Sequence, residues 1–216
     1  GVPSIINPDD KNALEEALRI KDENPDTTVT VVSMGPPQAD VAMREALAMG
    51  ADEAILISGR EFGGSDTWAT SYIIATAIKK IPDYDIIFCG RQAIDGDTAQ
   101  VGPQIAEQLN IPQITYVQKL DIEGDKVIVQ RQLEDGYTVV EAKMPVLLTA
   151  IKELNTPRYM TPKGIFEAYN KTVQVWGFND VPVDAEKIGL KGSPTNVNRT
   201  FSPEAKGKGI MLEGAD

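Results

Sequence analysis

Residues 28–57 read TVTVVSMGPPQADVAMREALAMGADEAILI and carry the clearest structural signal in the chain. The β-branched run at 28–33 predicts a strand, the turn residues Gly35-Pro36-Pro37 end it, and apolar residues at helical spacing follow over about 39–49. The apolar run 54–57 predicts a second strand. Apolar strands that alternate with helices are typical of a parallel sheet covered on both faces.

The same alternation continues on both sides of this stretch. Asn7-Pro8, followed by two carboxylates, predicts the start of a helix that runs to about residue 21, with Asn7 as its N-cap. A helix over about 66–81, a strand over 85–89 and a helix over about 97–109 are expected further along. The sequence therefore predicts a doubly wound, mostly parallel α/β sheet. Such a fold normally opens with a strand, so the first strand is expected to be missing from the chain.

The second half of the chain changes character. After a short predicted strand at 114–117, the runs 127–131 and 137–141 flank Glu134-Asp135-Gly136, which is typical of an antiparallel β-hairpin. A buried strand is expected at 145–149.

The end of the chain is rich in proline and glycine and poor in periodic apolar pattern. Such a stretch buries little by itself, so it is either a disordered tail or an arm that lies on a partner subunit, and we favour the arm. The expected organisation is an α/β domain over residues 1–176 and an extended C-terminal arm over residues 177–216.

Charge and hydropathy exclude several functional classes. The chain has 216 residues, of which 32 are acidic and 21 basic, and the net charge of -11 disfavours binding to nucleic acid or to an anionic membrane surface. The sequence contains neither an apolar run of about 18 residues nor a signal-peptide pattern, so a cytoplasmic protein without membrane insertion is expected.

The cysteine and histidine content limits the catalytic groups and metal sites that the chain can form. Histidine is absent and Cys89 is the single cysteine, which excludes an internal disulfide, a multi-cysteine metal site and a Ser-His-Asp or Cys-His catalytic group within this chain. We therefore expect no catalytic side chain and no metal site, and chemistry that resides on a bound cofactor. Cys89 ends a buried strand and is expected to pack as a small apolar side chain and not to act as a redox thiol.

Three loops follow predicted strands, where ligands bind in doubly wound sheets: residues 34–37, 62–67 and 89–103. In the third loop, glycines at 90, 96 and 102 would let the backbone approach a ligand closely. A helix that begins near Asp97 would direct free N–H groups at a phosphate. The alternative is that Asp97 and Thr98 only cap this helix and that the glycines only make turns.

The run 90–102, GRQAIDGDTAQVG, is similar to the adenine-nucleotide loop of electron transfer flavoprotein β subunits, and so are residues 7–8 with 13–17, residues 46–52 and LNTPRY at 154–159. The resemblance covers nearly the whole chain in the same order. It implies an α subunit as partner, with the C-terminal arm lying on it. It also implies nucleotide contacts at Asn7, Met34, Gly90, Thr98, Ala99, Gln100 and Val101. Asn7 could instead be only an N-cap, and Met34 only a packing residue.

Details of the loop resemble one branch of that family. The mitochondrial type has an acidic residue where Gly96 stands and Asn-Gln-Thr at 99–101, whereas this chain resembles the bifurcating branch, in which the β subunit holds a second FAD and oxidises NADH. The run 63–70, GGSDTWAT, also resembles that branch. Its Ser65, Asp66 and Thr67 would suit a flavin or a second nucleotide, or the run is a flexible turn with Ser65 or Asp66 as N-cap.

The resemblance to the bifurcating branch implies a path for electrons. NADH would reduce FAD, and the electrons would divide between an acyl-CoA-type dehydrogenase, reached through the α subunit, and ferredoxin or flavodoxin. Arg91 is the candidate for a positive charge that stabilises reduced flavin or a phosphate. The loop 159–164 stands where the family has its recognition loop for dehydrogenases. The alternative is a non-bifurcating β subunit with structural AMP.

Overall fold

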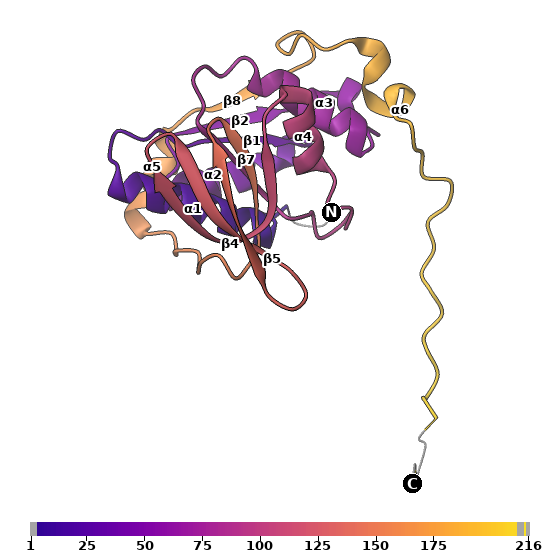
Figure 1. Ribbon diagram of the computed structural model, residues 1–216. Helices are drawn as coiled ribbons and strands as arrows, with labels where there is room; N and C mark the ends of the chain where they lie inside the picture. The colour runs from indigo at the N-terminus through magenta and orange to yellow at the C-terminus, as the bar shows by residue number, and fades with distance from the viewer. Residues whose placement is uncertain (1–3, 211–213, 215–216) are drawn as a thin grey trace.

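The computed structural model describes residues 4–210 and residue 214. Strands and helices alternate through the first half of the chain, and the helices cover the sheets in a layered α/β arrangement (Figure 1). The elements are α1 (Pro8–Glu23), β1 (Thr30–Met34), α2 (Asp40–Met49), β2 (Glu53–Ile57), α3 (Thr67–Ile78), β3 (Ile86–Gly90) and α4 (Val101–Leu109). The predicted order of elements is confirmed, but α4 begins four residues later than Asp97.

The second half contains the predicted hairpin and buried strand. The elements are β4 (Gln113–Glu123), β5 (Lys126–Gln132), β6 (Tyr137–Lys143), β7 (Val146–Ala150), α5 (Pro162–Asn170) and β8 (Val173–Trp176). Strand β5 pairs antiparallel with both β4 and β6, while β7 pairs parallel with β3 and β4. All five residues of β7 are buried, as expected for a strand covered on both faces.

The predicted α/β fold with mostly parallel pairing of the strands between helices is confirmed, and the strands are divided between two sheets. One sheet has the parallel order β1-β2-β8, and the other has the order β3-β7-β4-β5-β6. Within the described residues, β1 pairs only with β2 and β3 only with β7, so each is an edge strand. Both edge strands are apolar yet mostly half-buried, whereas β2 and β7 are almost wholly buried. The expectation of a first strand outside this chain remains a prediction.

Apolar side chains of the helices close the core over the sheets. Leu18 of α1 packs with Leu47 of α2 and Leu56 of β2, and all three are almost fully buried. Helix α5 packs against α2, and Gly164 permits this contact because a Cβ there would lie 2.3 Å from the carbonyl oxygen of Ala48. Burial of this kind supplies most of the stability of such a domain.

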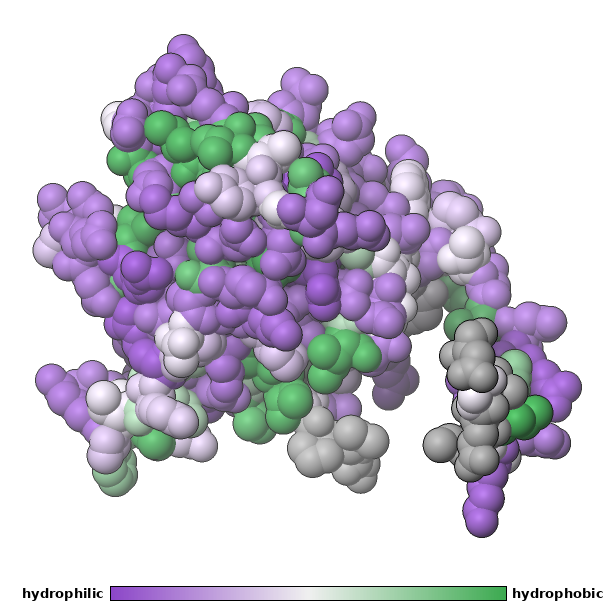
Figure 2. Space-filling model, turned by 60° about the horizontal axis from the view of Figure 1, so that its bottom comes forward, coloured by the Kyte–Doolittle hydropathy of each residue, from purple (hydrophilic) through white to green (hydrophobic). Residues whose placement is uncertain are grey.

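The surface agrees with the acidic composition. Figure 2 shows a mostly hydrophilic face on which the apolar areas form separate patches. Across residues 4–210, none of the helices is both long and apolar enough to cross a membrane.

The region predicted as an arm divides into two parts. Residues 177–195 pack on their own domain: Val181 and Ile188 are buried in a cluster with Ile73 of α3, and the short helices η3 (Ala185–Lys187) and α6 (Gly189–Gly192) lie in this part. Residues 196–210 then leave the domain as an exposed segment without helix or strand (Figure 1). Contact of the arm with a partner remains a prediction, now for the exposed part.

Candidate functional site

The loop between β3 and α4 lies at the carboxyl edge of the parallel strands β3 and β7, where ligands bind in open α/β sheets. Asn7 fastens this loop: its Nδ2 donates to the carbonyl oxygen of Gln92 at 2.9 Å, and its Oδ1 accepts from the N–H of Ile94 at 3.1 Å. Asn7 precedes α1, but its side chain makes no capping hydrogen bond there within the described structure. The side chain of Asn7 therefore shapes the loop instead of capping the helix.

At two of the three loop glycines, the missing side chain makes room for neighbouring parts of the protein itself. A Cβ on Gly90 would lie 2.6 Å from the backbone nitrogen of Asp10, because the start of α1 crosses the end of β3. A Cβ on Gly102 would lie 3.1 Å from Cγ2 of Thr149 in β7, so Gly102 permits close helix–sheet packing. Around Gly96, no described atom lies within 4 Å of the Cβ position. Of the three glycines, only Gly96 has open space at its Cβ position, where a ligand could come close to the backbone.

The residues before α4 would form a cradle of backbone N–H groups, to which Asp97 does not contribute because its N–H donates to the carbonyl oxygen of Ala93 at 3.0 Å. Asp97 and Ala99 have left-handed φ values of 56° and 53°, which explains why the helix begins at Val101 and not at Asp97. A left-handed residue followed by a right-handed one, as Ala99 and Gln100 are, turns successive N–H groups to one side and makes an anion-binding concavity. The first turn of α4 contains no acidic residue, and no side chain of the described residues caps it. Its positive end therefore remains uncompensated.

The second candidate loop is arranged differently. Asp66 is the N-cap of α3, and its carboxylate accepts from the N–H of Ala69 at 3.0 Å, so the capping alternative is what the structure contains. Ser65 Oγ accepts from the N–H of Gly189 at 2.9 Å. Of these three candidates, only Thr67 reaches the β3–α4 loop, because its Oγ1 donates to Oε1 of Gln100 at 2.9 Å.

The remaining candidates lie as follows. Met34 ends β1 half-buried in the apolar cluster of Phe62 and Ile73, which is its packing role. Nε of Arg91 lies 3.3 Å from the Asp9 carboxylate, so its positive charge is already shared. Burial raises the pKa of the Cys89 thiol to about 12, which disfavours the thiolate that redox chemistry requires.

The structure thus gathers most of the candidates but not all of them. The residues brought together around the β3–α4 loop are Asn7, Thr67, Gly90, Arg91, Asp97, Thr98, Ala99, Gln100 and Val101. Ser65 and Asp66 face the C-terminal segment, which sequence reasoning missed. It also missed Gln92, whose Nε2 donates to the carboxylate of Asp97. The contacts of Ser65 and Asp66 have no local sequence signal, because their partners in the C-terminal segment are more than a hundred residues away.

Hydrogen bonds dominate the electrostatics of Asp66. Partial burial alone would raise the pKa of its carboxyl group, but hydrogen bonds from Ala69 N–H, from the side chain and N–H of Thr195, and from Trp68 N–H together lower it below the ordinary value of 3.8. A carboxylate with a lowered folded-state pKa stabilises the fold above its unfolded pKa, and this stabilisation is lost as the pH falls through the folded pKa.

The lowered pKa of Asp66 predicts how the stability of an Asp66→Asn variant depends on pH. Asparagine keeps the N-cap acceptor but not the charge, so the wild type should be the more stable protein at neutral pH. The difference in free energy of unfolding should shrink as the pH drops below about 4, because Asp66 then becomes protonated. Urea titrations of both proteins between neutral pH and about pH 3 measure it. A difference that stays constant over this range would contradict the assignment.

Comparison with known proteins shows which family this chain is similar to. The profile described as "Electron transfer flavoprotein domain" matches residues 1–181. The chain is 64% identical over 215 residues to "Electron transfer flavoprotein subunit beta" of Thermoanaerobacterium thermosaccharolyticum. It is 59% identical over 214 residues to "Caffeyl-CoA reductase-Etf complex subunit CarD" of Acetobacterium woodii, and 54% identical over 220 residues to "Acryloyl-CoA reductase electron transfer subunit gamma" of Anaerotignum propionicum. Each alignment covers 99% of this chain and 82% of the relative.

Proposed function

The chain belongs to the electron transfer flavoprotein family, and we propose that it is a β subunit that binds FAD at the β3–α4 loop and takes electrons from NADH for bifurcation. The observation that carries this proposal is the turn with left-handed φ at Asp97 and Ala99, which opens on the uncapped start of α4 and would direct the N–H groups of residues 98–101 at a phosphate.

The donors in the loop suit the phosphates of FAD. No lysine or arginine occurs from residue 93 to residue 117, so a phosphate would be held by main-chain N–H groups and the dipole of α4. Gly96, whose Cβ position is open, and the small side chain of Ala99 leave room for a pyrophosphate beyond the first phosphate. AMP would use only the first phosphate position, so this space favours FAD.

The other residues of the site orient the loop. Asn7 would fix residues 92–94 through its two hydrogen bonds, and Thr67 would hold Gln100 at the helix start. Arg91 would add a positive charge that Asp9 moderates. When bound, FAD would accept a hydride from NADH and pass the electrons along two routes, to a dehydrogenase through the α subunit and to ferredoxin or flavodoxin. None of the residues in the loop is required to act as an acid or base.

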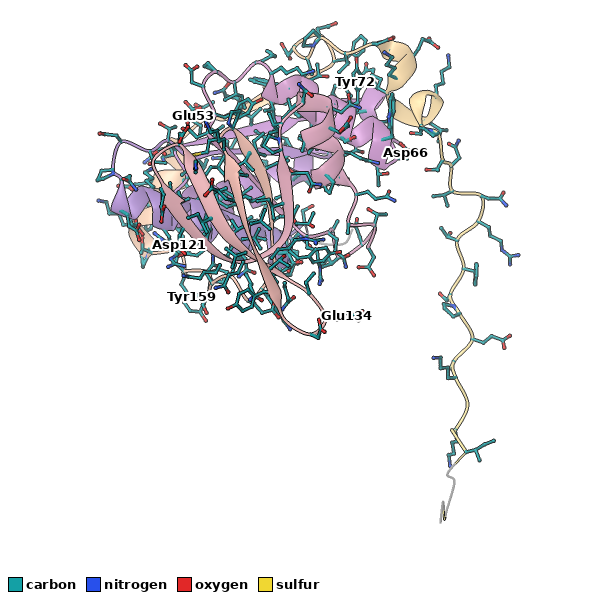
Figure 3. The ribbon with its side chains drawn as sticks, in the orientation of Figure 1. Glu53, Asp66, Tyr72, Asp121, Glu134 and Tyr159 are labelled. Carbon is teal, nitrogen blue, oxygen red and sulfur yellow. The ribbon has the colours of Figure 1, made fainter. Side chains whose placement is uncertain are left out.

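Two exposed surfaces fit the partners of such a subunit. The segment 196–210 carries the exposed side chains of Val197, Phe201 and Ile210, which an α subunit would cover. On a separate part of the molecule, Tyr159 and the exposed Phe166 of α5 would meet an acyl-CoA-type dehydrogenase. Figure 3 shows Tyr159 on the opposite side of the molecule from Asp66 and the arm, so both surfaces would be accessible at the same time.

The cofactor content of the purified αβ heterodimer tests the proposal. We expect two FAD for each heterodimer, and bleaching of the flavin absorbance when NADH is added. The nucleotides released on denaturation are identified by chromatography against FAD and AMP standards. One FAD together with one AMP would overturn the bifurcating assignment and leave a non-bifurcating β subunit with structural AMP.

A further inference from the structure

The C-terminal segment returns to the amino end of α3 and is bonded there on several atoms. The carboxylate of Asp66 accepts from the N–H of Thr195 at 2.9 Å and from its Oγ1 at 2.8 Å. The N–H of Asp66 donates to Oγ of Ser193 at 2.8 Å, and Ser193 in turn donates to the carbonyl oxygen of Gly189 at 2.7 Å. We call residues 189–195, held on the loop 64–66, the clasp.

The clasp requires particular residues at its start. Gly189 has a φ of +62°, and a Cβ there would lie 2.5 Å from the carbonyl oxygen of Glu61. Its N–H donates to Ser65, and Ser193 is 7% exposed. Just before the clasp, the N–H of Asp184 donates to the hydroxyl of Tyr72 at 3.0 Å, so the segment is also fastened one turn further along α3. Figure 3 shows Asp66 and Tyr72 beside this segment at the base of the arm.

Neighbouring residues connect the clasp to the candidate cofactor loop. Asp66 bonds Thr195 on one side, and Thr67 bonds Gln100, the N-cap of α4, on the other. A shift of the start of α3 would therefore act on the side chain of Gln100 through this hydrogen bond. The described residues from 194 on are exposed, and Thr195 is the last residue of the clasp that is hydrogen-bonded to Asp66. A partner that orders the arm would therefore act first on the hydrogen bonds between Thr195 and Asp66.

We propose that the clasp couples docking of the arm on the α subunit to cofactor binding at residues 97–101, through the path Thr195, Asp66, Thr67 and Gln100. The proposal rests on the proposed function, since it concerns regulation of the same site. Arm docking holds Thr195 on Asp66, which orders the start of α3 and with it the cradle. Because coupling of two binding equilibria is reciprocal, bound cofactor tightens the association of the two subunits by the same factor.

The test compares the wild type with S193A/T195V, which removes the two clasp hydroxyl groups and keeps side-chain size nearly constant. The matched control is T200V, which makes the same change outside the clasp, in the exposed segment. The affinity of the subunits for each other is measured with and without added FAD, and again with AMP. We expect nucleotide to tighten wild-type and T200V association by about 5-fold or more, and the double variant by about 2-fold or less. Equal factors in all three proteins would overturn the coupling.

Hydrogen exchange measured without nucleotide tests the link between the arm and the loop separately from the identity of the cofactor. Binding of the α subunit should slow exchange at residues 64–69 and 97–101 in the wild type and in T200V, and at neither stretch in S193A/T195V. If neither FAD nor AMP binds but this pattern of exchange is found, the proposed function fails, while the conformational link from the arm to residues 97–101 stands. If exchange at 97–101 responds equally in all three proteins, the coupling fails whatever nucleotide is bound.

Discussion

Replacing Ala99 with valine is expected to weaken FAD retention by the heterodimer by about tenfold or more. Ala99 has a φ of 53°, a left-handed conformation that a β-branched side chain adopts only with strain. Strain at such a position costs on the order of 1–3 kcal/mol, and about 1.4 kcal/mol corresponds to a factor of ten in affinity. Valine should relax the loop towards another conformation and turn the N–H groups of the cradle apart.

Ala99→Gly is the matched control, because glycine adopts a left-handed φ without a steric penalty. This variant should keep FAD affinity within about threefold of the wild type, the margin expected if only loop entropy changes. Fluorescence titration of the flavin-free heterodimer with FAD measures all three proteins. If valine and glycine lower the affinity equally, the left-handed cradle is not what holds the cofactor.

Replacing Arg158 with alanine is expected to lower the free energy of unfolding by about 2–3 kcal/mol, less than for a fully buried ion pair because the Arg158 side chain is 31% exposed. Glu15 of α1 is 5% exposed and accepts from Nε of Arg158 at 2.8 Å and from Nη2 at 3.0 Å. Hydrogen bonds from Arg158 to Glu15 and then to Asp22 raise the pKa of the guanidinium, as a strong pair requires. Alanine would leave the Glu15 carboxylate buried without its charged partner.

Lys163→Ala provides the control for the loss of a positive charge. Lys163 lies 3.6 Å from Glu167 on the surface of α5, and both side chains are mostly exposed. Such a pair contributes about 0.5 kcal/mol or less. Urea unfolding of the wild type and both variants gives the comparison. A loss below about 1 kcal/mol for Arg158→Ala would show that Glu15 finds water or another donor, against the buried-pair interpretation.

Arg158 also bears on function through its place in the chain. It directly precedes Tyr159, the exposed residue of the surface proposed to meet a dehydrogenase. Asn155 ties the same segment to α1, because its Nδ2 donates to the carboxylate of Glu16 at 2.8 Å. The loop that follows therefore starts from a rigid base on α1, as precise docking of a partner requires.

Local patterns in the sequence determined the elements of this fold. The apolar runs at 54–57 and 145–149 predicted buried strands, and the turn at 134–136 predicted the hairpin between β5 and β6. Pro8 marked the start of α1 and Asp66 that of α3. These signals act over a few residues, because helical or strand period and capping depend on near neighbours along the chain.

The tertiary structure alone decided which partners those residues meet. Gly90 was expected to admit a ligand, but the start of α1, eighty residues earlier in the chain, crosses it instead. Asp66 was expected to hold a cofactor or cap a helix, and it caps α3 while also binding Thr195. The left-handed φ values in the β3–α4 loop occur at Asp97 and Ala99, and neither residue is the glycine that would have predicted such a φ. Contacts between distant segments depend on how whole elements pack, and no local period or cap encodes that packing.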